Sequence, residues 1–385
     1  MIYFDNSATT KIDPTVLTTY DQVAREIWGN PSSLHRLGDR AAQLLASSRE
    51  QLADLLGTKP SELFFTSGGT EANNWAIKGT AWQKQTFGQH LITSSVEHAS
   101  VANAFTALEN QGFRVTRLPV DKAGRVNVND LRAALDSDTT LVSVMGVNNE
   151  IGTIQPIEDI SDLLANYPTV NFHVDNVQAI GKNIWSRVFT PRVDLVSLSA
   201  HKFHAPRGTG ILYKKAGKMI LPLHDGGGQE QGLRSGTENL PAIAGMAKAL
   251  RLLLTDEVEK ADREAAIKRK IVDYLQAKPG IEIFSPVSLN FAPHILCFAL
   301  TGIRGETLVH TLEEYDIYTS TTSACASTRS ATASTLSAMQ ITDRVATSAI
   351  RLSFDETNTM AEAEEFIRVF EEIYQHFAPI NHLGE

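Results

Sequence analysis

The chain has 385 residues, of which 42% are hydrophobic and 21% are charged, and its formal net charge is −9. This length allows a large buried core divided among one to three domains. An acidic chain without a basic run argues against nucleic acid or an anionic membrane as its main partner.

From the N-terminal residues we expect no export signal. Residues 1–5 lack both a basic n-region and an apolar h-region, and no apolar run is long enough to cross a bilayer. The only two cysteines, Cys297 and Cys325, are too few for a disulfide framework or a cysteine-rich zinc site. We therefore expect a protein of the reducing cytoplasm with no membrane segment and no metal site.

Two helices are expected in the N-terminal part. Asp13 and Pro14 form a typical helix start, with the aspartate as N-cap and the proline in the first turn. Residues 36–56 carry leucine and alanine at helical spacing, and Gly57 follows the last of them. A glycine at that place favours a helix end.

Strands and helices alternate from residue 61 to about residue 215. This alternation predicts a mostly parallel sheet, which we expect to have seven strands and helices on both faces. In such sheets ligands bind at the carboxyl ends of the strands, so the polar residues there are candidates as a group. The expected strands are residues 63–66, 90–94, 115–118, 140–144, 172–175 and 193–199, and residues 208–213 are expected to return as an antiparallel or an edge strand.

The C-terminal third predicts a smaller α+β domain. A long helix at about 240–277, with a break, is expected to lead into strands at 281–284, 295–300 and 349–354 and a final helix at 360–377. We expect a large domain of residues 14–250 and a small domain of residues 1–13 and 251–385. The segment at about 318–337 is mostly Ser, Thr and Ala, a composition that buries little and favours a mobile loop.

Lys202 carries the strongest chemical signal. It comes at the end of an apolar strand beside Ser199 and His201, a place where a lysine can form a Schiff base. Asp175 ends the preceding strand. A lysine for the aldehyde and an aspartate for the ring nitrogen are the two groups that pyridoxal phosphate requires of a protein. Asp175 could be an ordinary helix N-cap, but its place one strand before Lys202 favours the ring partner.

A phosphate site is predicted at residues 67–74, Ser-Gly-Gly-Thr-Glu-Ala-Asn-Asn, which join a strand to a helix. Glycines let the backbone approach an anion, and a helix N-terminus offers free N–H groups. We expect Gly69 and Thr70 to bind the phosphate, and a plain glycine-rich turn is the alternative. Ser199 and His201 could reach the same phosphate, although His201 alone would be read as a core histidine.

Four further residues are candidates for the cofactor ring and the substrate. His98 follows a strand and could stack on the ring and move protons. Asn149 and Gln178 are strand-end amides suited to the ring oxygen, although each alone could be a turn residue. Arg351 lies within a C-terminal strand, where its guanidinium could bind a substrate carboxylate. An internal salt bridge is the alternative for Arg351.

The two cysteines have different expected roles. Cys297 lies in a hydrophobic strand and is expected to be a small core residue. Cys325 lies in the Ser, Thr and Ala segment, where it has no packing role and its thiol would be accessible as a nucleophile.

Together these motifs resemble the NifS/IscS-type cysteine desulfurases of the class V aminotransferase family, over essentially the whole chain. The matching segments are residues 67–74, Glu-His at 97–98, Asn-Asn-Glu-Ile-Gly-Thr-Ile-Gln-Pro at 148–156, His-Val-Asp-Asn-Val-Gln at 173–178, Ser-Leu-Ser-Ala-His-Lys at 197–202, Arg-Ser-Gly-Thr-Glu-Asn at 234–239 and Ser-Ala-Cys at 323–325. The similarity departs after Cys325, where residues 326–335 are mostly Ala, Ser and Thr.

The resemblance implies a fold type I homodimer that uses pyridoxal phosphate to convert L-cysteine to L-alanine and a Cys325 persulfide. Lys202 and His98 would move protons, Arg351 and Asn149 would bind the substrate, and Thr237 would reach the phosphate from the other subunit. The sulfur would pass to an acceptor protein, either an iron–sulfur scaffold or a tRNA-thiolation enzyme. Another class V activity, an aminotransferase or a selenocysteine lyase, is the alternative, and Cys325 is the residue that argues against an aminotransferase.

Overall fold

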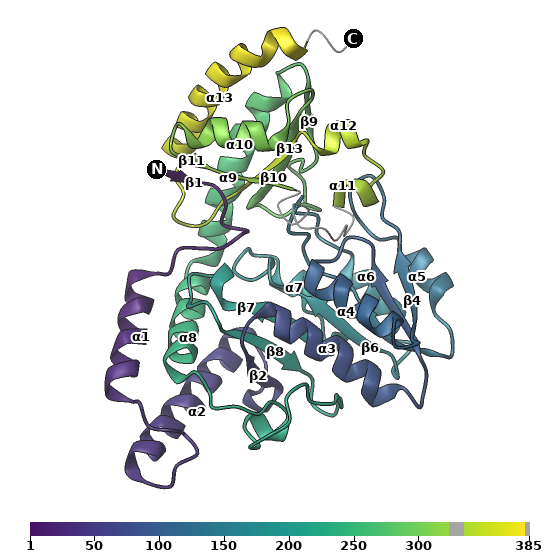
Figure 1. Ribbon diagram of the computed structural model, residues 1–385, viewed down its shortest axis with the longest axis vertical. Coiled ribbons are helices and arrows are strands. Elements are labelled where there is room, and N and C mark those ends of the chain that lie inside the picture. The colour runs from purple at the N-terminus through teal and green to yellow at the C-terminus, as the bar shows by residue number, and fades with distance from the viewer. Residues whose placement is uncertain (323–334, 382–385) are drawn as a thin grey trace.

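A computed structural model describes residues 1–322 and 335–381, and its larger part is one seven-stranded sheet (Figure 1). The strand order is β2-β8-β7-β6-β5-β3-β4, and the neighbours from β7 to β4 are parallel. The strands are β2 (Leu63–Thr66), β3 (His90–Ser94), β4 (Arg114–Leu118), β5 (Thr139–Ser143), β6 (Asn171–Asp175), β7 (Leu195–Ser199) and β8 (Gly210–Lys214). The mostly parallel sheet is confirmed. β8 is antiparallel to both neighbours, so the antiparallel expectation holds and the edge position is wrong.

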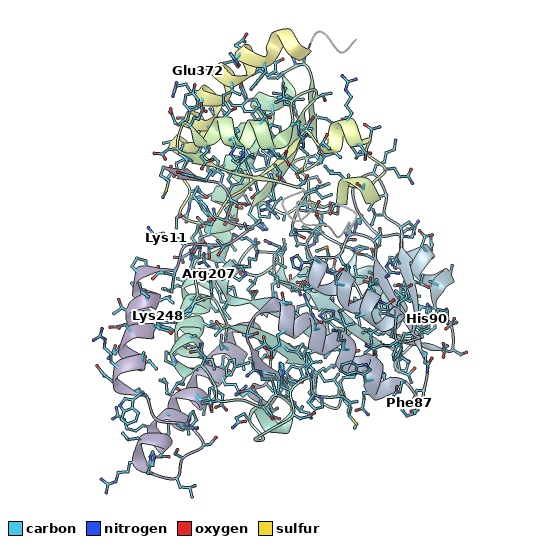
Figure 2. All side chains as sticks on the ribbon, in the orientation of Figure 1. Lys11, Phe87, His90, Arg207, Lys248 and Glu372 are labelled. Atoms are coloured by element: carbon cyan, nitrogen blue, oxygen red, sulfur yellow. The ribbon has the colours of Figure 1, made fainter. Side chains whose placement is uncertain are left out.

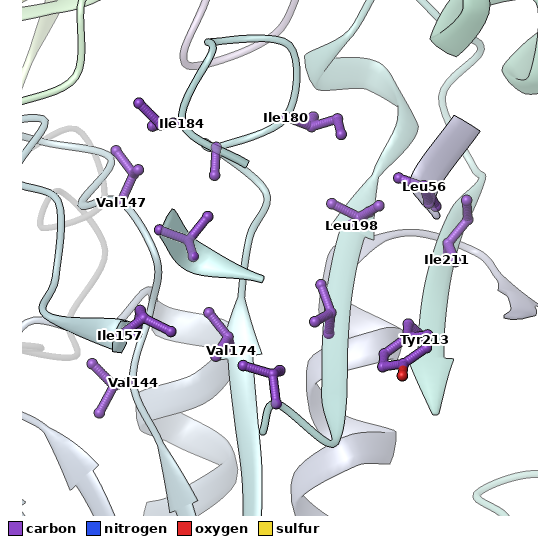
Figure 3. Close-up of a cluster of buried hydrophobic side chains, with 14 of the residues drawn as sticks. Leu56, Val144, Val147, Ile157, Val174, Ile180, Ile184, Leu198, Ile211 and Tyr213 are labelled. Carbon is purple, nitrogen blue, oxygen red and sulfur yellow. The ribbon is translucent and has the colours of Figure 1, made fainter. Parts of the chain in front are cut away.

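Helices cover both faces of this sheet because its apolar residues alternate. On β8, Leu212 packs with Trp75, while Ile211 and Tyr213 join a second cluster that includes Met246. Figure 3 shows part of that second cluster. The helices on the Trp75 face are α3 (Gly69–Lys84) and α4 (Ala99–Glu109); those on the Met246 face are α5 (Val128–Ala134), α6 (Ile157–Leu164), α7 (Trp185–Val188) and α8 (Leu240–Leu254).

The two N-terminal helices begin and end where the sequence predicts. Helix α1 (Pro14–Glu26) is capped by Asp13, whose Oδ1 accepts hydrogen bonds from the backbone N–H groups of Thr15 and Val16 at 2.7 and 3.2 Å. Helix α2 (Arg36–Leu56) ends at Gly57, which has a φ of 69°. Both helices pack against α8.

A smaller sheet, in the order β12-β13-β10-β9, forms the upper part of Figure 1. Its core is a separate cluster that contains Phe4, Phe298, Phe366 and Phe370. The strands are β9 (Ile281–Ile283), β10 (Ile295–Leu300), β12 (Ser320–Thr321) and β13 (Ala349–Ser353), and the helices are α9 (Glu257–Gln276), α10 (Gly305–Glu313), α11 (Thr335–Ala338), α12 (Asp343–Ala346) and α13 (Met360–Asn381). The expected helix at 240–277 is thus two helices, because Asp256 between them has a φ of 53°. In the described ranges, no helix combines the length and apolarity that a membrane span needs.

The N-terminal segment joins the two parts. β1 (Ile2–Tyr3) pairs in parallel with β11 (Ile317–Tyr318) beside the smaller sheet. The chain then crosses to the larger part, where the N–H of Thr10 donates to the carbonyl of His201 at 2.9 Å. Residues 5–10 therefore lie at the carboxyl end of β7, between the two sheets.

Candidate active site

A cavity of about 790 Å³ lies at the carboxyl ends of β6 and β7, between the larger sheet, the N-terminal segment and the smaller sheet. Many of the residues selected from the sequence line it. These are Gly69, Thr70, His98, Asn149, Asp175, Gln178, Ser199, His201, Lys202 and Arg351. The topology thus brings together side chains from the larger sheet's strand ends and from β13 of the smaller sheet.

Lys202 extends from the wall of this cavity. It ends the short 3-10 helix Ala200–Lys202 that directly follows β7. Its Nζ donates to the carbonyl oxygens of Ser7 at 2.5 Å and Ala8 at 2.9 Å. The amine therefore lies beside the N-terminal segment, where a ligand in the cavity could contact it.

Asp175 ends β6 and is almost fully buried, with 5% of its surface exposed. Its Oδ2 accepts from Asn73 Nδ2 at 2.7 Å, and its Oδ1 accepts from the N–H of Val177 at 3.1 Å. A buried carboxylate with only neutral donors beside it is a suitable partner for a cationic ring nitrogen.

Asn73 also connects Asp175 to His98. Its Nδ2 donates to Ser100 Oγ at 2.8 Å, and Ser100 Oγ lies 2.8 Å from His98 Nδ1. The N–H of Ser100 donates to the same Nδ1 at 3.2 Å. Burial lowers the pKa of His98, with Lys202 adding to the effect and Asp175 opposing it. The imidazole is therefore neutral near pH 7, and because Nδ1 accepts, its proton lies on Nε2.

The glycine turn before α3 allows a close approach to β7. A Cβ at Gly69 would lie 3.1 Å from Val177 Cγ2 and 3.2 Å from Ser199 Cβ, so a larger residue would push these groups apart. Gly68, the N-cap, has a φ of 150°, which favours glycine. The free N–H groups of the first turn of α3 thus lie beside Ser199, and together they could bind an anion.

His201 lies on the wall beside the N-terminal segment. Its Nδ1 is 3.1 Å from Thr9 Oγ1. Burial lowers its pKa to about 4, with further lowering by Lys202 and Arg207. A neutral imidazole can donate one hydrogen bond to a phosphate oxygen without adding a charge.

Arg351 lies on β13 and faces the cavity while it makes an internal ion pair. Its Nη2 donates to Asp5 Oδ1 at 2.8 Å, and its Nη1 donates to the carbonyl of Asn149 at 2.9 Å. Its Nε is buried and has no partner among the described residues. The salt bridge considered as an alternative therefore exists, in a place where the guanidinium still lines the cavity.

One predicted residue, Thr237, is not among the described residues that line this cavity. Thr237 is exposed on the segment before α8. Cys325 lies outside the described residues, as does the middle of the expected loop at 318–337. The ends of that loop are regular structure, because Ser320 and Thr321 pair with β13 and Leu336 is buried in α11. Composition alone does not show such backbone pairing.

The cavity is also lined by residues that were not predicted from the sequence, among them Asn73, Glu97 and Arg207. Glu97 is buried. Its Oε1 accepts hydrogen bonds from Ser94 Oγ at 2.6 Å and from the N–H of Met145 at 2.9 Å. Burial raises the pKa of Glu97 to about 8. Arg207 also lines this cavity. Figure 2 shows it near the junction between the part with the larger sheet and the part with the smaller sheet. Asn73 and Glu97 lie inside the matching segments 67–74 and 97–98, which is the signal that could have identified them.

The chemistry of this donor set fits pyridoxal phosphate. A lysine amine, a buried carboxylate and a neutral imidazole face the same space as a glycine turn at a helix N-terminus. Such groups could hold the aldehyde, the ring nitrogen, the ring face and the phosphate of that cofactor, in that order.

Known proteins are similar to this chain in sequence and in fold. Residues 2–366 match the family model described as Aminotransferase class-V. A NifS/IcsS protein homolog of Lactobacillus delbrueckii subsp. bulgaricus is 73% identical over 385 residues, which is 100% of both chains. The cysteine desulfurase IscS of Methanosarcina thermophila is 40% identical over 97% of this chain and 92% of its own.

Among solved structures, a NifS-like protein superposes with a TM-score of 0.90 at 40% identity, over 97% of this chain and 99% of its own. The architecture is therefore that of the fold type I pyridoxal phosphate enzymes. The chain belongs to the class V aminotransferase family and, within it, to the NifS/IscS cysteine desulfurases.

Proposed function

We propose that this chain converts L-cysteine to L-alanine and transfers the sulfur atom to Cys325 as a persulfide. The proposal rests on one observation, which is that Lys202, Asp175 and Arg351 line the same cavity. Thr322, three residues before Cys325 in the sequence, lines the same cavity. The names of the similar proteins agree with this chemistry.

The family depends on pyridoxal phosphate, which when bound serves as an electron sink for the bonds at the substrate α-carbon. In our proposal Lys202 holds its aldehyde carbon and Asp175 holds its ring nitrogen, while His98 stacks on the ring. Asn149 and Gln178 contact the ring oxygen. The phosphate is bound by Gly69, Thr70, Ser199 and His201 and, from a second subunit, Thr237.

The substrate is oriented by Arg351, whose guanidinium would bind the carboxylate of cysteine beside Asn149. Asp5 and the carbonyl of Asn149 already hold that guanidinium, so its plane is fixed before substrate arrives. Lys202 Nζ and His98 Nε2 move protons at the substrate carbons. These two groups suit the task because one is a flexible amine and the other a neutral imidazole.

Sulfur transfer would be carried out by the Cys325 thiolate. It attacks the substrate sulfur, so that an S–S bond forms as the substrate C–S bond breaks, and protonation of the remaining carbon gives alanine. One cysteine and one thiol thus yield one alanine and one persulfide, with no outside oxidant. The persulfide would then pass to an acceptor protein, an iron–sulfur scaffold or a tRNA-thiolation enzyme.

The organisation of the protein forms part of the same proposal. Residues 14–250 would form the large domain, and residues 1–13 with 251–385 the small domain; separate sheets and separate apolar clusters support this division. We propose a cytoplasmic homodimer in which Thr237 completes the partner's phosphate site.

The test is the product ratio from L-cysteine, with pyridoxal phosphate and a thiol reductant, for the wild type and Cys325→Ala. We expect alanine and sulfide in equal amounts, lost in the variant while the visible cofactor absorbance remains. A 2-oxo acid as product would indicate the aminotransferase alternative. A parallel assay with L-selenocysteine decides whether the selenium substrate is preferred.

A further inference from the structure

The turn at residues 148–150 is hydrogen-bonded to Thr335, the first described residue after the segment that carries Cys325. The backbone N–H of Thr335 donates to Glu150 Oε2 at 3.1 Å. Asn148 Nδ2 donates to Thr335 Oγ1 at 3.0 Å. Thr335 is 2% exposed, so both bonds are shielded from competing water.

This turn is rigid in its own right. Asn148 Oδ1 accepts from the N–H groups of Glu150 and Ile151, both at 2.9 Å, and Asn148 Nδ2 also donates to the carbonyl of Val96 at 3.1 Å. Asn148 is fully buried. A contact to this turn therefore fixes Thr335 relative to the larger sheet.

The same turn forms part of the cavity wall. Asn149 lies between the two anchoring residues, and its carbonyl accepts from Arg351 Nη1 at 2.9 Å. Asn149, Glu150 and Arg351 all line the cavity. The residues that hold Thr335 thus adjoin those that would bind the substrate.

Apolar packing supports the polar contacts. Leu336 is fully buried and Met339 nearly so, in a cluster with Ile151, Phe284 and Cys297. The chain after residue 335 is therefore anchored by two hydrogen bonds and by a small core. On the other side of the segment, β12 is paired with β13, so both ends are fixed.

We propose that Asn148 and Glu150 are positioning residues for sulfur transfer, which fix the far end of the Cys325 segment beside the substrate site. This inference rests on the proposed function. A tether fixed at both ends raises the effective concentration of a group it carries, and release of one end lowers that concentration. Loss of the anchor should therefore slow the attack by Cys325 and leave substrate binding unchanged.

The experiment measures persulfide formation on Cys325 in a single turnover of the holoenzyme with L-cysteine, without reductant. Glu150→Ala removes the acceptor for Thr335, and we expect the rate to fall about tenfold. Glu150→Gln keeps an acceptor oxygen and should restore the rate to near the wild-type value. Thr335→Val keeps the N–H but loses the hydroxyl, so a smaller decrease is expected. Glu158→Ala, an exposed carboxylate on α6, is the matched control without effect.

Two further readouts separate positioning from a general loss of structure. The affinity for L-alanine, measured by the change in cofactor absorbance, should be equal in Glu150→Ala and wild type. Amide hydrogen exchange at residues 335–339 should become faster in Glu150→Ala only. An unchanged persulfide rate, or a loss of L-alanine affinity in parallel with the rate, overturns the inference.

Failure of the proposed function would look different. In that case the wild type itself forms no persulfide on Cys325. The hydrogen-exchange comparison still decides whether the anchor exists, and equal exchange in Glu150→Ala and wild type would overturn it.

Discussion

Asp175 is a buried carboxylate in the wall of the cavity. Its carboxylate accepts hydrogen bonds from Asn73 and from the backbone of Val177, and both donors are neutral. Neither donor carries a positive charge that would compete with a ligand cation for this buried carboxylate. The chain through Asn73 and Ser100 also fixes the orientation of His98.

Replacement of this charge gives the first prediction. Asp175→Asn keeps the size of the side chain but cannot balance a positive ring nitrogen, so we expect kcat/KM for L-cysteine to fall about 100-fold, or about 2.7 kcal/mol. Steady-state alanine production measures it. Asp159→Asn, on the exposed side of α6, is the control. Wild-type activity in Asp175→Asn would rule out the ring-nitrogen role.

Glu97 gives a prediction for the pH dependence of stability. Burial raises its pKa from 4.5 to about 8 in the folded chain. Between these values the folded state holds a proton that the unfolded state has lost, so this group makes the free energy of unfolding decrease as pH rises from 4.5 to 8.

Glu97→Gln cannot titrate and should remove that decrease. Its amide oxygen can still accept from Ser94 and the N–H of Met145. We expect the free energy of unfolding of the variant, relative to wild type, to increase between pH 5 and pH 8 by at least about 1 kcal/mol. Urea unfolding of the cofactor-free chains at the two pH values measures it. A difference that is the same at both pH values would contradict the assignment.

At the scale of single elements, local signals predicted much of the structure. The Asp13 cap, the Gly57 helix end and the strands of the larger sheet all lie where sequence patterns indicated. The candidate residues on β6 and β7 were also predictable, because parallel strands bring their carboxyl ends to one edge. Asp175 and Lys202 therefore line one cavity, as their positions in the sequence suggested.

Contacts between distant segments were not predictable in this way. β1 pairs with β11, Arg351 pairs with Asp5, and Thr335 bonds to Glu150. In each case the local sequence indicates a strand or a polar side chain, but it does not indicate which distant residue that strand or side chain contacts. For the same reason the composition of residues 318–337 predicts a loop, although its ends form β12 and α11.

Helix α13 provides a stability prediction at this scale. Phe366 is fully buried between Phe4, at a ring centroid distance of 6.1 Å, and Phe370, at 5.5 Å. Phe366→Ala should lower the free energy of unfolding by about 3–5 kcal/mol, since it leaves a cavity in the core of the smaller sheet. Phe87→Ala, at a side chain that is 80% exposed, is the matched control. Denaturant unfolding that shows equal effects for the two variants would contradict the packing account.

At the scale of the whole molecule, the cavity depends on segments from both sheets and from the N-terminus. In one chain Thr237 does not reach this cavity, although Arg234 on the same segment donates to Glu71 of α3 at 2.8 Å. The proposed dimer would bring Thr237 to the cavity of the partner subunit. This arrangement predicts that a dimer of two subunits with different defects can contain one intact site.

Subunit mixing tests that arrangement. Lys202→Ala removes the proposed cofactor link, and Thr237→Glu places a negative charge against the partner's phosphate, so each variant alone should be inactive. A mixed dimer combines Lys202 from one chain with Thr237 from the other in one site. We expect activity to appear when the two are unfolded, mixed and refolded together. No gain on mixing, or a monomeric mass in solution, would contradict the shared site.

In the proposed reaction the sulfur of cysteine passes to Cys325. The most direct measurement is the mass of the peptides of the holoenzyme after one turnover with L-cysteine in the absence of reductant. We expect one added sulfur atom on the peptide that contains Cys325 and none on Cys297, which is fully buried and whose thiol pKa is raised by that burial. Alanine formed without sulfur on Cys325, or sulfur found on Cys297, would contradict it.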